Sequence, residues 1–260
     1  LPVVRFIVRA VDNILEKDFG LLEGLTDTTK IEITKNVQSK NIKDSVHKVQ
    51  ILDPAVGTGT FLNEVIKNIY SRFKNQEGRW KSYIESDLLL RVHGFELMMA
   101  PYTIAHLKLG MTLKETKAGE LKTRLGIYLT NTLEEAKSSI WGDGSLFVGV
   151  QESITKEAME ASKVKSEYPI MCVIGNPPYS GISQNKIYTD NNVYKVEIGG
   201  KQKLQERKHW LDDDYVKFIR FAESLIEKNG EGIMGMITAH GYIDNPTFRG
   251  MRWHLRNTFD

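Results

Sequence analysis

A short apolar run, a turn with two glycines and a helical pattern follow one another near residue 50, and this order constrains the fold more than any other feature. Residues 49–52 predict a buried strand, and residues 61–73 predict a helix. The turn between them reads Asp53-Pro54-Ala55-Val56-Gly57-Thr58-Gly59-Thr60. Glycine lets the backbone turn sharply and approach a ligand without an intervening side chain. A strand, a glycine turn and a helix in this order are typical of α/β domains that bind a ligand at the turn.

The alternation of strands and helices continues along the 260 residues of the chain. Apolar residues at helical spacing predict helices at 3–15, 98–113, 151–165, 214–228 and 248–257. Further strands are predicted at 91–97, 125–130, 170–175 and 232–238. We therefore expect an α/β fold with a mostly parallel sheet and helices on both of its faces. In such sheets ligands lie beyond the carboxyl ends of the strands, so the residues that follow each strand are the candidates for a site.

Two stretches lack a regular pattern. Residues 26–47 are polar, and we expect no strand or helix there. Residues 180–211 show no periodicity and are long for a connection between elements, which is typical of a functional segment.

The composition is that of an ordinary globular protein, with 41% hydrophobic and 26% charged residues. No apolar run approaches the roughly 20 residues of a membrane-spanning helix, and the first residues lack the pattern of a signal peptide. Cys172 is the single cysteine, so we expect neither a disulfide framework nor a thiolate metal site. The cytoplasm is the expected compartment. The histidines are scattered without ligand spacing, and we predict no metal site.

Glu96 stands at the end of the second predicted strand, where a carboxylate can accept hydrogen bonds from both hydroxyls of a ribose. A dinucleotide-binding site would need a third glycine where this chain has Leu62. It would also need an acid about 20 residues after the turn, and Glu96 comes much later. These departures disfavour a nicotinamide or flavin enzyme.

The run Asn176-Pro177-Pro178-Tyr179, called the NPPY motif below, directly follows the fourth predicted strand and is the most specific signal in the chain. Consecutive prolines stiffen the backbone and remove N–H donors. What remains is a rigid set of acceptors: the Asn176 side-chain carbonyl and nearby main-chain carbonyls. Such a set suits a planar amino group that must give up hydrogens, and the ring of Tyr179 offers a face on which a base can stack.

The irregular segment after the motif is basic, although the net charge of the whole chain is only +2. Residues 181–210 contain six Lys and Arg residues against three acids. The segment is either a solvated loop or a set of phosphate contacts beside an active site. The residues in question are Lys186, Lys195, Lys201, Lys203, Arg207 and Lys208.

The glycine turn, Glu96 and the NPPY motif, in this order, resemble the amino-methyltransferase family, and specifically the N6-adenine-specific DNA methyltransferases. The runs at 94–109 and 244–252 are most similar to the methyltransferase regions of single-chain restriction–modification enzymes. The resemblance implies a Rossmann-like methyltransferase fold with S-adenosylmethionine as cofactor. It also implies double-stranded DNA as partner, with the target adenine flipped out of the duplex.

The resemblance assigns roles to individual residues. It implies catalytic roles for Asn176, Pro177, Pro178 and Tyr179. Glu96 matches the acid that binds the cofactor's ribose, Asn131 lies in the segment that contacts the cofactor's adenine, and Phe218 is expected to stack near that adenine. The match to the family's cofactor motif comprises Asp53, Pro54, Ala55, Gly57, Gly59, Thr60 and Phe61.

We expect one methyltransferase catalytic domain over residues 1–260, with a helix and lead-in at 1–47, a cofactor-binding half at 48–150 and a catalytic half at 151–260. Compared with the family, the catalytic half is truncated at its C-terminal end, and the target-recognition domain is absent. We therefore expect a fragment of a larger protein, which need not be active alone and whose other domains, including a target-recognition domain, are its partners.

Alternatives from the same chemistry remain open. The NPPY motif also occurs in methyltransferases that act on RNA or on a protein glutamine, because a glutamine amide poses the same electronic problem. N4-cytosine methylation in DNA is a closer alternative, but serine more often stands there in the place of Asn176. A module that keeps the fold and has lost the activity is the alternative from a different class.

Overall fold

The computed structural model describes the chain except residues 38–39, 120, 135–147, 180, 182, 184 and 206–208, and it describes the backbone alone at 35–37, 40–42 and 148–155. Its centre is a sheet of five parallel strands in the order β5-β4-β3-β6-β7. The strands are β3 (Gln50–Asp53), β4 (Val92–Glu96), β5 (Gly126–Leu129), β6 (Ile170–Gly175) and β7 (Ile233–Met236).

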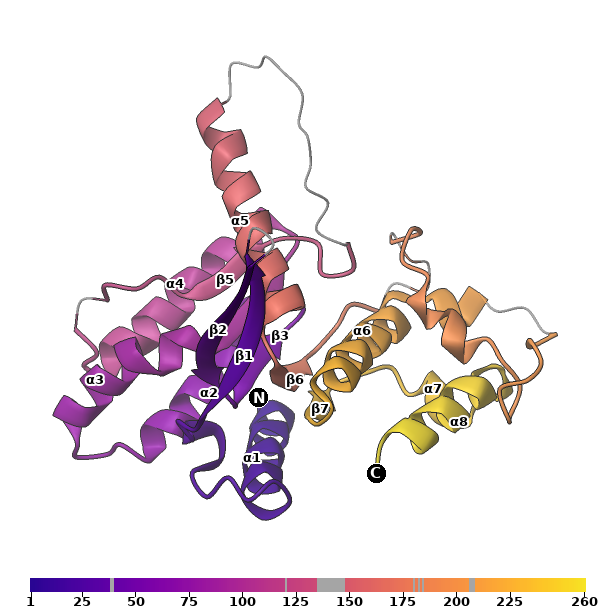
Figure 1. The fold of residues 1–260 in the computed structure, drawn as a ribbon, viewed down its shortest axis with the longest axis horizontal. Helices are drawn as coiled ribbons and strands as arrows, with labels where there is room; N and C mark the ends of the chain where they lie inside the picture. The colour runs from indigo at the N-terminus through magenta and orange to yellow at the C-terminus, as the bar shows by residue number, and fades with distance from the viewer. Residues whose placement is uncertain are drawn as a thin grey trace.

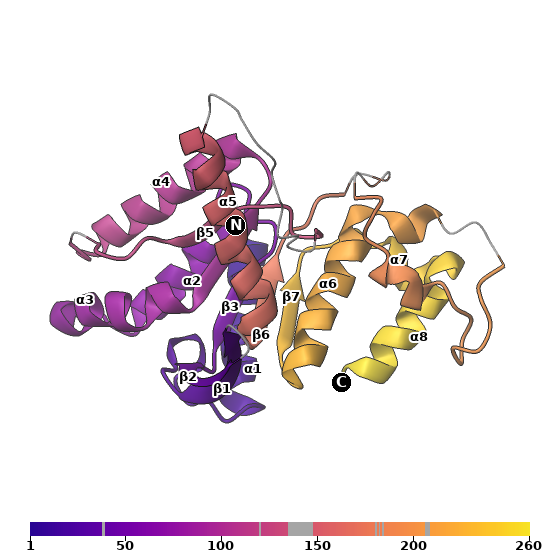
Figure 2. The same cartoon turned by 45° about the horizontal axis from the view of Figure 1, so that its top comes forward.

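Helices cover both faces of the sheet (Figures 1 and 2). Successive side chains of a strand point to opposite faces, and Ile51 and Leu52 of β3 accordingly belong to two different hydrophobic clusters. The Ile51 cluster includes residues of α1 (Pro2–Lys17), α2 (Thr60–Ser71) and α4 (Met99–Glu115). The Leu52 cluster includes residues of α5 (Val148–Glu167) and α6 (Asp214–Asn229). The predicted layered α/β fold is confirmed.

Residues of α6 that are not part of the Leu52 cluster belong to a third, smaller hydrophobic cluster, in which they pack against the C-terminal part of the chain. Tyr194, Tyr215 and Met251 are buried in it. In Figure 1 this part lies to the right, beyond β7. Its elements are η3 (Asp190–Tyr194), η4 (His209–Asp212), α7 (Gly241–Asp244), η5 (Pro246–Phe248) and α8 (Arg249–Thr258).

Charged groups join α6 to α8 next to that cluster. Arg220 lies 2.9 Å from Glu223 and 3.0 Å from Glu227, and His254 of α8 lies 2.8 Å from Glu223. Although burial raises the pKa of Glu223, hydrogen bonds from His254, Tyr194 and Arg220 lower it below the ordinary value. The two carboxylates and His254 are close enough to hold a metal ion, but Arg220 already supplies the positive charge between the carboxylates.

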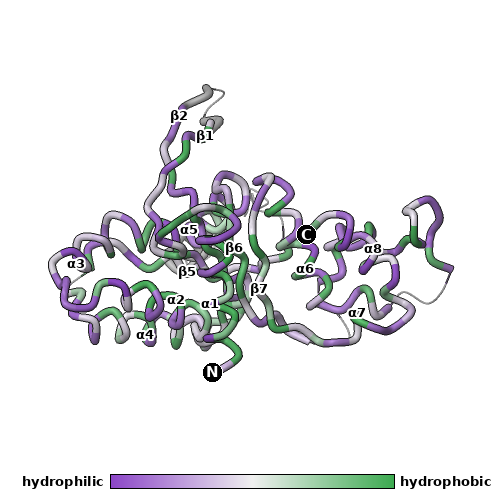
Figure 3. The backbone as a smooth tube through the Cα atoms, turned by 90° about the horizontal axis from the view of Figure 1, so that it is seen from below, coloured by the Kyte–Doolittle hydropathy of each residue, from purple (hydrophilic) through white to green (hydrophobic). Residues whose placement is uncertain are grey.

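All predicted strands and helices are present, with ends that differ by a few residues. The absence of structure predicted for 26–47 was wrong: β1 (Lys30–Val37) and β2 (Lys40–His47) form an antiparallel hairpin that projects from the body (Figure 3). Ile31 and Ile33 alternate with polar residues, which is the period of a strand. Missing from the prediction are also α3 (Glu77–Ser86), α7 and all the 3-10 helices, which include η1 (Gly24–Thr26) and η2 (Leu88–Leu90). Within the described part of the chain, no helix is both long and apolar enough to cross a membrane.

Two glycines give opposite predictions for stability. A Cβ at Gly250 in α8 would overlap the carbonyl oxygens of Tyr194 and Val196, whereas a Cβ at Gly110 in α4 meets no atom within 4 Å. We expect Gly250→Ala to lower the free energy of unfolding by about 1–3 kcal/mol through overpacking. Gly110→Ala should raise it by about 0.5–1 kcal/mol, because alanine favours the helix. Urea unfolding of both variants checks this, and a loss of stability in both would contradict it.

Candidate active site

The carboxyl ends of β3 and β6 define the candidate site. From β3 the chain continues to β4 and β5 on one side and then crosses to β6 and β7 on the other side. Ligands of open α/β sheets bind where the strand order reverses in this way. Asp53, which ends β3, and Asn176, which follows β6, are therefore neighbours at the predicted place.

The glycine turn after β3 has a backbone that favours glycine. Gly57 and Gly59 have φ angles of 56° and 77°, and Gly59 is the N-cap residue directly before α2. Main-chain N–H groups tie the turn to the end of β4: Val56 donates to the Phe95 carbonyl (3.0 Å) and Gly57 to Glu96 Oε2 (2.8 Å). A Cβ at Gly57 would meet no atom within 4 Å, so the turn faces open space.

Glu96 is fixed from two sides. Its Oε2 accepts from Gly57 N, and its Oε1 accepts from Met98 N (2.8 Å). The side chain remains half-exposed. A carboxylate offers about four lone-pair positions, so acceptor capacity is left for hydroxyl groups of a ligand.

Asp53 is a buried acid, with 1% of its surface exposed. Its pKa is raised from 3.8 to about 7, and burial is the largest cause. The hydrogen bond that it accepts from Ala55 N (3.0 Å) lowers the pKa, and the nearby charge of Glu96 raises it. In the described part of the chain no cationic side chain pairs with it. A Cβ at Gly175 would lie 2.7 Å from Asp53 Oδ1, so the glycine before the NPPY motif allows the two strand ends to approach.

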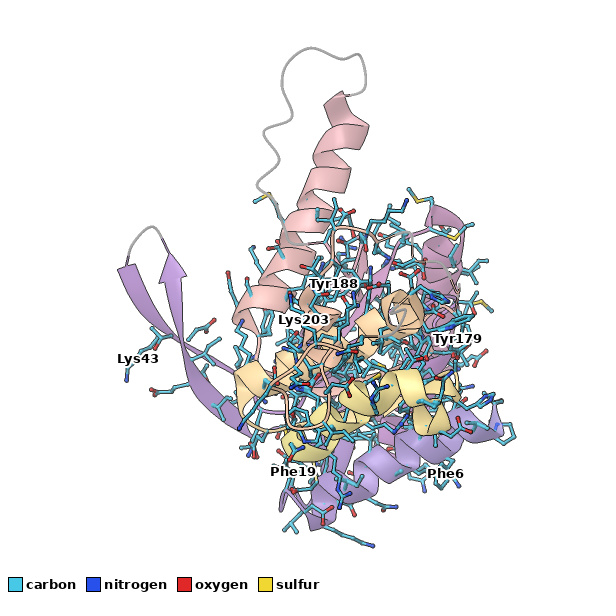
Figure 4. All side chains as sticks on the ribbon, turned by 90° about the vertical axis from the view of Figure 1, so that its right-hand side faces the viewer. Phe6, Phe19, Lys43, Tyr179, Tyr188 and Lys203 are labelled. Carbon is cyan, nitrogen blue, oxygen red and sulfur yellow. The ribbon has the colours of Figure 1, made fainter. Side chains whose placement is uncertain are left out.

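The NPPY motif places an amide and a ring side by side at the edge of the sheet. Asn176 is exposed and Pro177 is buried. The Tyr179 hydroxyl donates to Asn176 Oδ1 and lies 3.1 Å from the Ile237 carbonyl oxygen. Its ring is 48% exposed and stands edge-on to Tyr215 at 6.4 Å. Figure 4 shows Tyr179 on the side of the molecule away from the hairpin with Lys43.

The loop after β5 is bonded to the glycine turn. Thr132 Oγ1 donates to the Pro54 carbonyl (2.5 Å), and Thr130 N donates to the Glu96 carbonyl (2.8 Å). Asn131 is half-buried between them, and its Nδ2 donates to Glu134 Oε1 (3.0 Å) and Asn185 Oδ1 (2.8 Å). The ends of β3, β4 and β5 thus form one hydrogen-bonded unit.

The other residues predicted to bind the cofactor lie in or beside the hydrophobic clusters or at the start of α2. The rings of Phe61 and Phe218 are buried in the two main hydrophobic clusters, on opposite faces of the sheet. Thr60, at the start of α2, is half-buried, and its hydroxyl accepts from Lys108 Nζ (3.2 Å). Ala55 packs beside the cluster that contains Phe218.

The predicted basic residues differ in exposure. Lys186, Lys201 and Lys203 are exposed, and Figure 4 labels Lys203. Lys195 is half-buried and forms an ion pair with Asp212 (2.5 Å). Arg207 and Lys208 lie outside the described residues.

Several contributors to the site were not predicted. Gly175 could have been noticed, because it stands between an apolar strand and the NPPY motif. No pattern singles out Thr132, Tyr215 or Lys217 within its segment, since each acquires its role from a contact with a distant part of the chain.

Comparison with known proteins agrees with this geometry. The family model described as "MmeI, DNA-methyltransferase domain" matches residues 29–238, and the chain therefore belongs to this family of DNA-methyltransferase domains. No curated protein matches. The predicted resemblance to the methyltransferase region of single-chain restriction–modification enzymes is confirmed.

Similar solved structures come from restriction–modification enzymes and their DNA complexes. A nuclease-deletion mutant of the Type ISP enzyme LlaGI with a DNA substrate mimic is 25% identical, with a TM-score of 0.71 over 100% of this chain and 19% of that chain. A DrdV–DNA complex is 28% identical, with a TM-score of 0.69 over 99% and 22%. The ATP-dependent Type ISP enzyme LlaBIII bound to DNA is 25% identical, with a TM-score of 0.67 over 96% and 15%. The chain thus spans about a fifth of these proteins or less.

Asp53→Asn tests the buried acid through the pH dependence of stability. The folded pKa of about 7 lies above the ordinary 3.8, so the acid costs no stability below pH 4 and an increasing amount as the pH rises to 7. Each pKa unit corresponds to about 1.4 kcal/mol, and we expect Asp53→Asn to be more stable than wild type by a few kcal/mol at pH 8. Urea unfolding without cofactor at pH 5 and pH 8 measures this, with the exposed Asp190→Asn as control. An advantage that does not grow with pH would contradict the assignment.

Proposed function

We propose that this chain transfers a methyl group from S-adenosylmethionine to N6 of adenine in DNA, as the methyltransferase part of a restriction–modification enzyme. The observation that carries the proposal is the position of the NPPY motif beside Asp53 at the reversal of strand order. In this reading the half at 48–150 binds the cofactor and the half at 151–260 presents the target base.

The residues beside the glycine turn suit this cofactor. Glu96 keeps acceptor capacity for the two ribose hydroxyls, and Gly57 faces open space. Asp53 is a buried acid without a cationic partner among the described residues, and the cofactor carries positive charge that would favour its ionised form. When bound, the cofactor supplies a methyl group made electrophilic by a positively charged sulfur.

The NPPY motif addresses the amino group of adenine. The lone pair of N6 is delocalised into the ring, and two acceptors that receive hydrogen bonds from its two N–H groups redirect that lone pair. On methylation the nitrogen keeps one hydrogen and releases the other as a proton to solvent. We assign these acceptors to Asn176 Oδ1 and the Pro177 carbonyl, which the prolines hold rigidly. The base would leave the stack to reach them. Catalysis then consists of positioning and charge stabilisation.

Tyr179 serves as the stacking surface in this proposal. Its exposed ring stands next to Asn176, and its hydroxyl donates to the same oxygen that the amino group would use. An amide oxygen has two lone pairs, so Asn176 Oδ1 keeps one position for a hydrogen bond from a bound base. The second contact of the hydroxyl is with the Ile237 carbonyl oxygen.

DNA is the proposed partner because the similar solved structures are described as complexes with DNA or a DNA mimic. The exposed Lys186, Lys201 and Lys203 follow the NPPY motif in the chain and offer phosphate contacts. Arg207 and Lys208 belong to the same proposed set.

Asn176→Ala should reduce the rate of methyl transfer to DNA by about 10²–10³-fold, which is typical for loss of one oriented polar group at the reacting centre. Cofactor affinity should stay near the wild-type value, since the side chain faces the base. Single-turnover assays and calorimetry measure the two quantities. An unchanged transfer rate would remove Asn176 from the mechanism.

Tyr179→Ala should weaken capture of the flipped base by about 1–3 kcal/mol, whereas Tyr179→Phe should stay close to wild type because it keeps the ring. Steady-state kinetics with a duplex that contains the target site compare the two variants. An equal loss of activity in both variants would show that the hydroxyl, rather than the ring, captures the base.

Transfer of labelled methyl groups separates the remaining substrates. Label in N6-methyladenine supports the proposal. Label in N4-methylcytosine, RNA or a protein glutamine would replace it by the corresponding alternative.

A further inference from the structure

A hydrogen bond between Asn131 and Asn185 spans the carboxyl edge of the sheet. Asn131 follows β5, and Asn185 belongs to the segment after the NPPY motif, which leaves the sheet from β6. Strands β4 and β3 lie between β5 and β6. At a spacing of about 4.8 Å per strand, the ends of β5 and β6 are roughly 14 Å apart. Nevertheless Asn131 Nδ2 donates to Asn185 Oδ1 at 2.8 Å, so Asn185 lies beside the loop after β5, across the site from β6.

Asn185 is also held by α6. Its Nδ2 donates to Asp214 Oδ1 (3.1 Å), and its main-chain N donates to Ser183 Oγ (3.0 Å). The Ser183 hydroxyl in turn donates to Asp214 Oδ1 (2.6 Å). Gly181 N donates to Asp213 Oδ2 (3.2 Å). The first turn of α6 therefore fixes the described residues that directly follow the motif.

Lys217 completes this attachment with a buried charge. Its side chain is 2% exposed, and Nζ donates to Ser183 Oγ (3.1 Å) and to the Asn185 carbonyl. Burial lowers its pKa, while Asp212 and Asp214 oppose that effect. A buried ammonium group is costly unless it is hydrogen-bonded, so Lys217 favours the observed position of Asn185 over others.

The hydrogen bond between Asn131 and Asn185 is called the bridge below. Its Asn131 end is attached to the glycine turn. The side-chain Oδ1 of Asn131 accepts from Leu133 N (3.1 Å), and the main-chain carbonyl of Asn131 accepts from Lys165 Nζ (2.8 Å). Through Thr132 the same loop is bonded to Pro54. Hydrogen bonds therefore connect the glycine turn to the loop of Asn131, and Asn131 to Asn185.

We propose that Asn185 is a positioning residue that couples the cofactor loop to the NPPY motif. It does not touch the reacting atoms. It holds the chain after Tyr179 in register with the loop after β5, so that cofactor binding at the glycine turn and base binding at Asn176 favour the same arrangement. The expected effect on the rate of methylation rests on the proposed methyl transfer. The expected effect on the structure rests on the hydrogen bond between Asn131 and Asn185 alone.

A double-mutant cycle in the intact protein tests the kinetic consequence. We expect Asn131→Ala and Asn185→Ala each to lower kcat for DNA methylation about tenfold with cofactor and DNA saturating, which corresponds to about 1.4 kcal/mol. The double variant should be no more than about twofold worse than either single variant, because residues that share one interaction are not additive. Asn192→Ala, an exposed asparagine of η3, should leave kcat unchanged. Fully multiplicative losses, or no loss from Asn185→Ala, would overturn the inference.

Amide hydrogen exchange gives a second readout that needs no methylation. In Asn131→Ala the amides of Gly181 and Asn185 should exchange about tenfold or more faster than in wild type, which requires loss of about 1.4 kcal/mol of local stability. Asn192→Ala should not change them. Unchanged exchange in Asn131→Ala overturns the coupling even if the enzyme methylates DNA. Faster exchange in a protein that does not methylate DNA supports the bridge and refutes the proposed function instead.

Discussion

Parallel pairing between β3 and β6 brings together two loops that are far apart in the sequence, and the site depends on that pairing. The first loop presents glycines and an acid, and the second presents the NPPY motif. Their approach is close enough that Gly175 cannot gain a Cβ without pressing on Asp53. Hydrophobic layers on both faces of the sheet hold the strands in this arrangement. The polar edge can therefore expose unsatisfied groups to ligands without a loss of the fold.

Electrostatics divide the site into two regions. Asp53 and Glu96 place two acids next to the glycine turn, and the burial of Asp53 keeps its pKa near 7. A cation bound there would relieve the cost of ionising Asp53. The region around Asn176 instead offers neutral acceptors and an aromatic ring. A cationic cofactor beside a neutral, hydrogen-accepting base pocket is the combination that methyl transfer to an amino group requires.

The sequence predicted the structural features that produce a local pattern of residues. The periods of the apolar residues predicted the sheet strands and most of the helices, and the positions of the motifs directly after strands predicted that they would lie at the carboxyl edge of the sheet. The hairpin β1–β2 was missed because its strands are mostly polar, and α3 because most of its residues are polar or charged. The bridge from Asn131 to Asn185 was out of reach, because a hydrogen bond between residues on different loops has no spacing to recognise. Phe61 and Phe218 stand among the apolar residues of two predicted helices, which agrees with their burial in the core, whereas the family resemblance assigned them to the cofactor site.

The most direct test of the central claim is a map of modified bases. The intact gene, expressed in a host that lacks DNA methylation, should place N6-methyladenine at one recurring sequence of the host DNA, as read by single-molecule sequencing. The Asn176→Ala variant should leave that sequence unmodified. An unmodified genome in cells that contain the folded, cofactor-binding wild-type protein would contradict the assignment of adenine in DNA as the substrate.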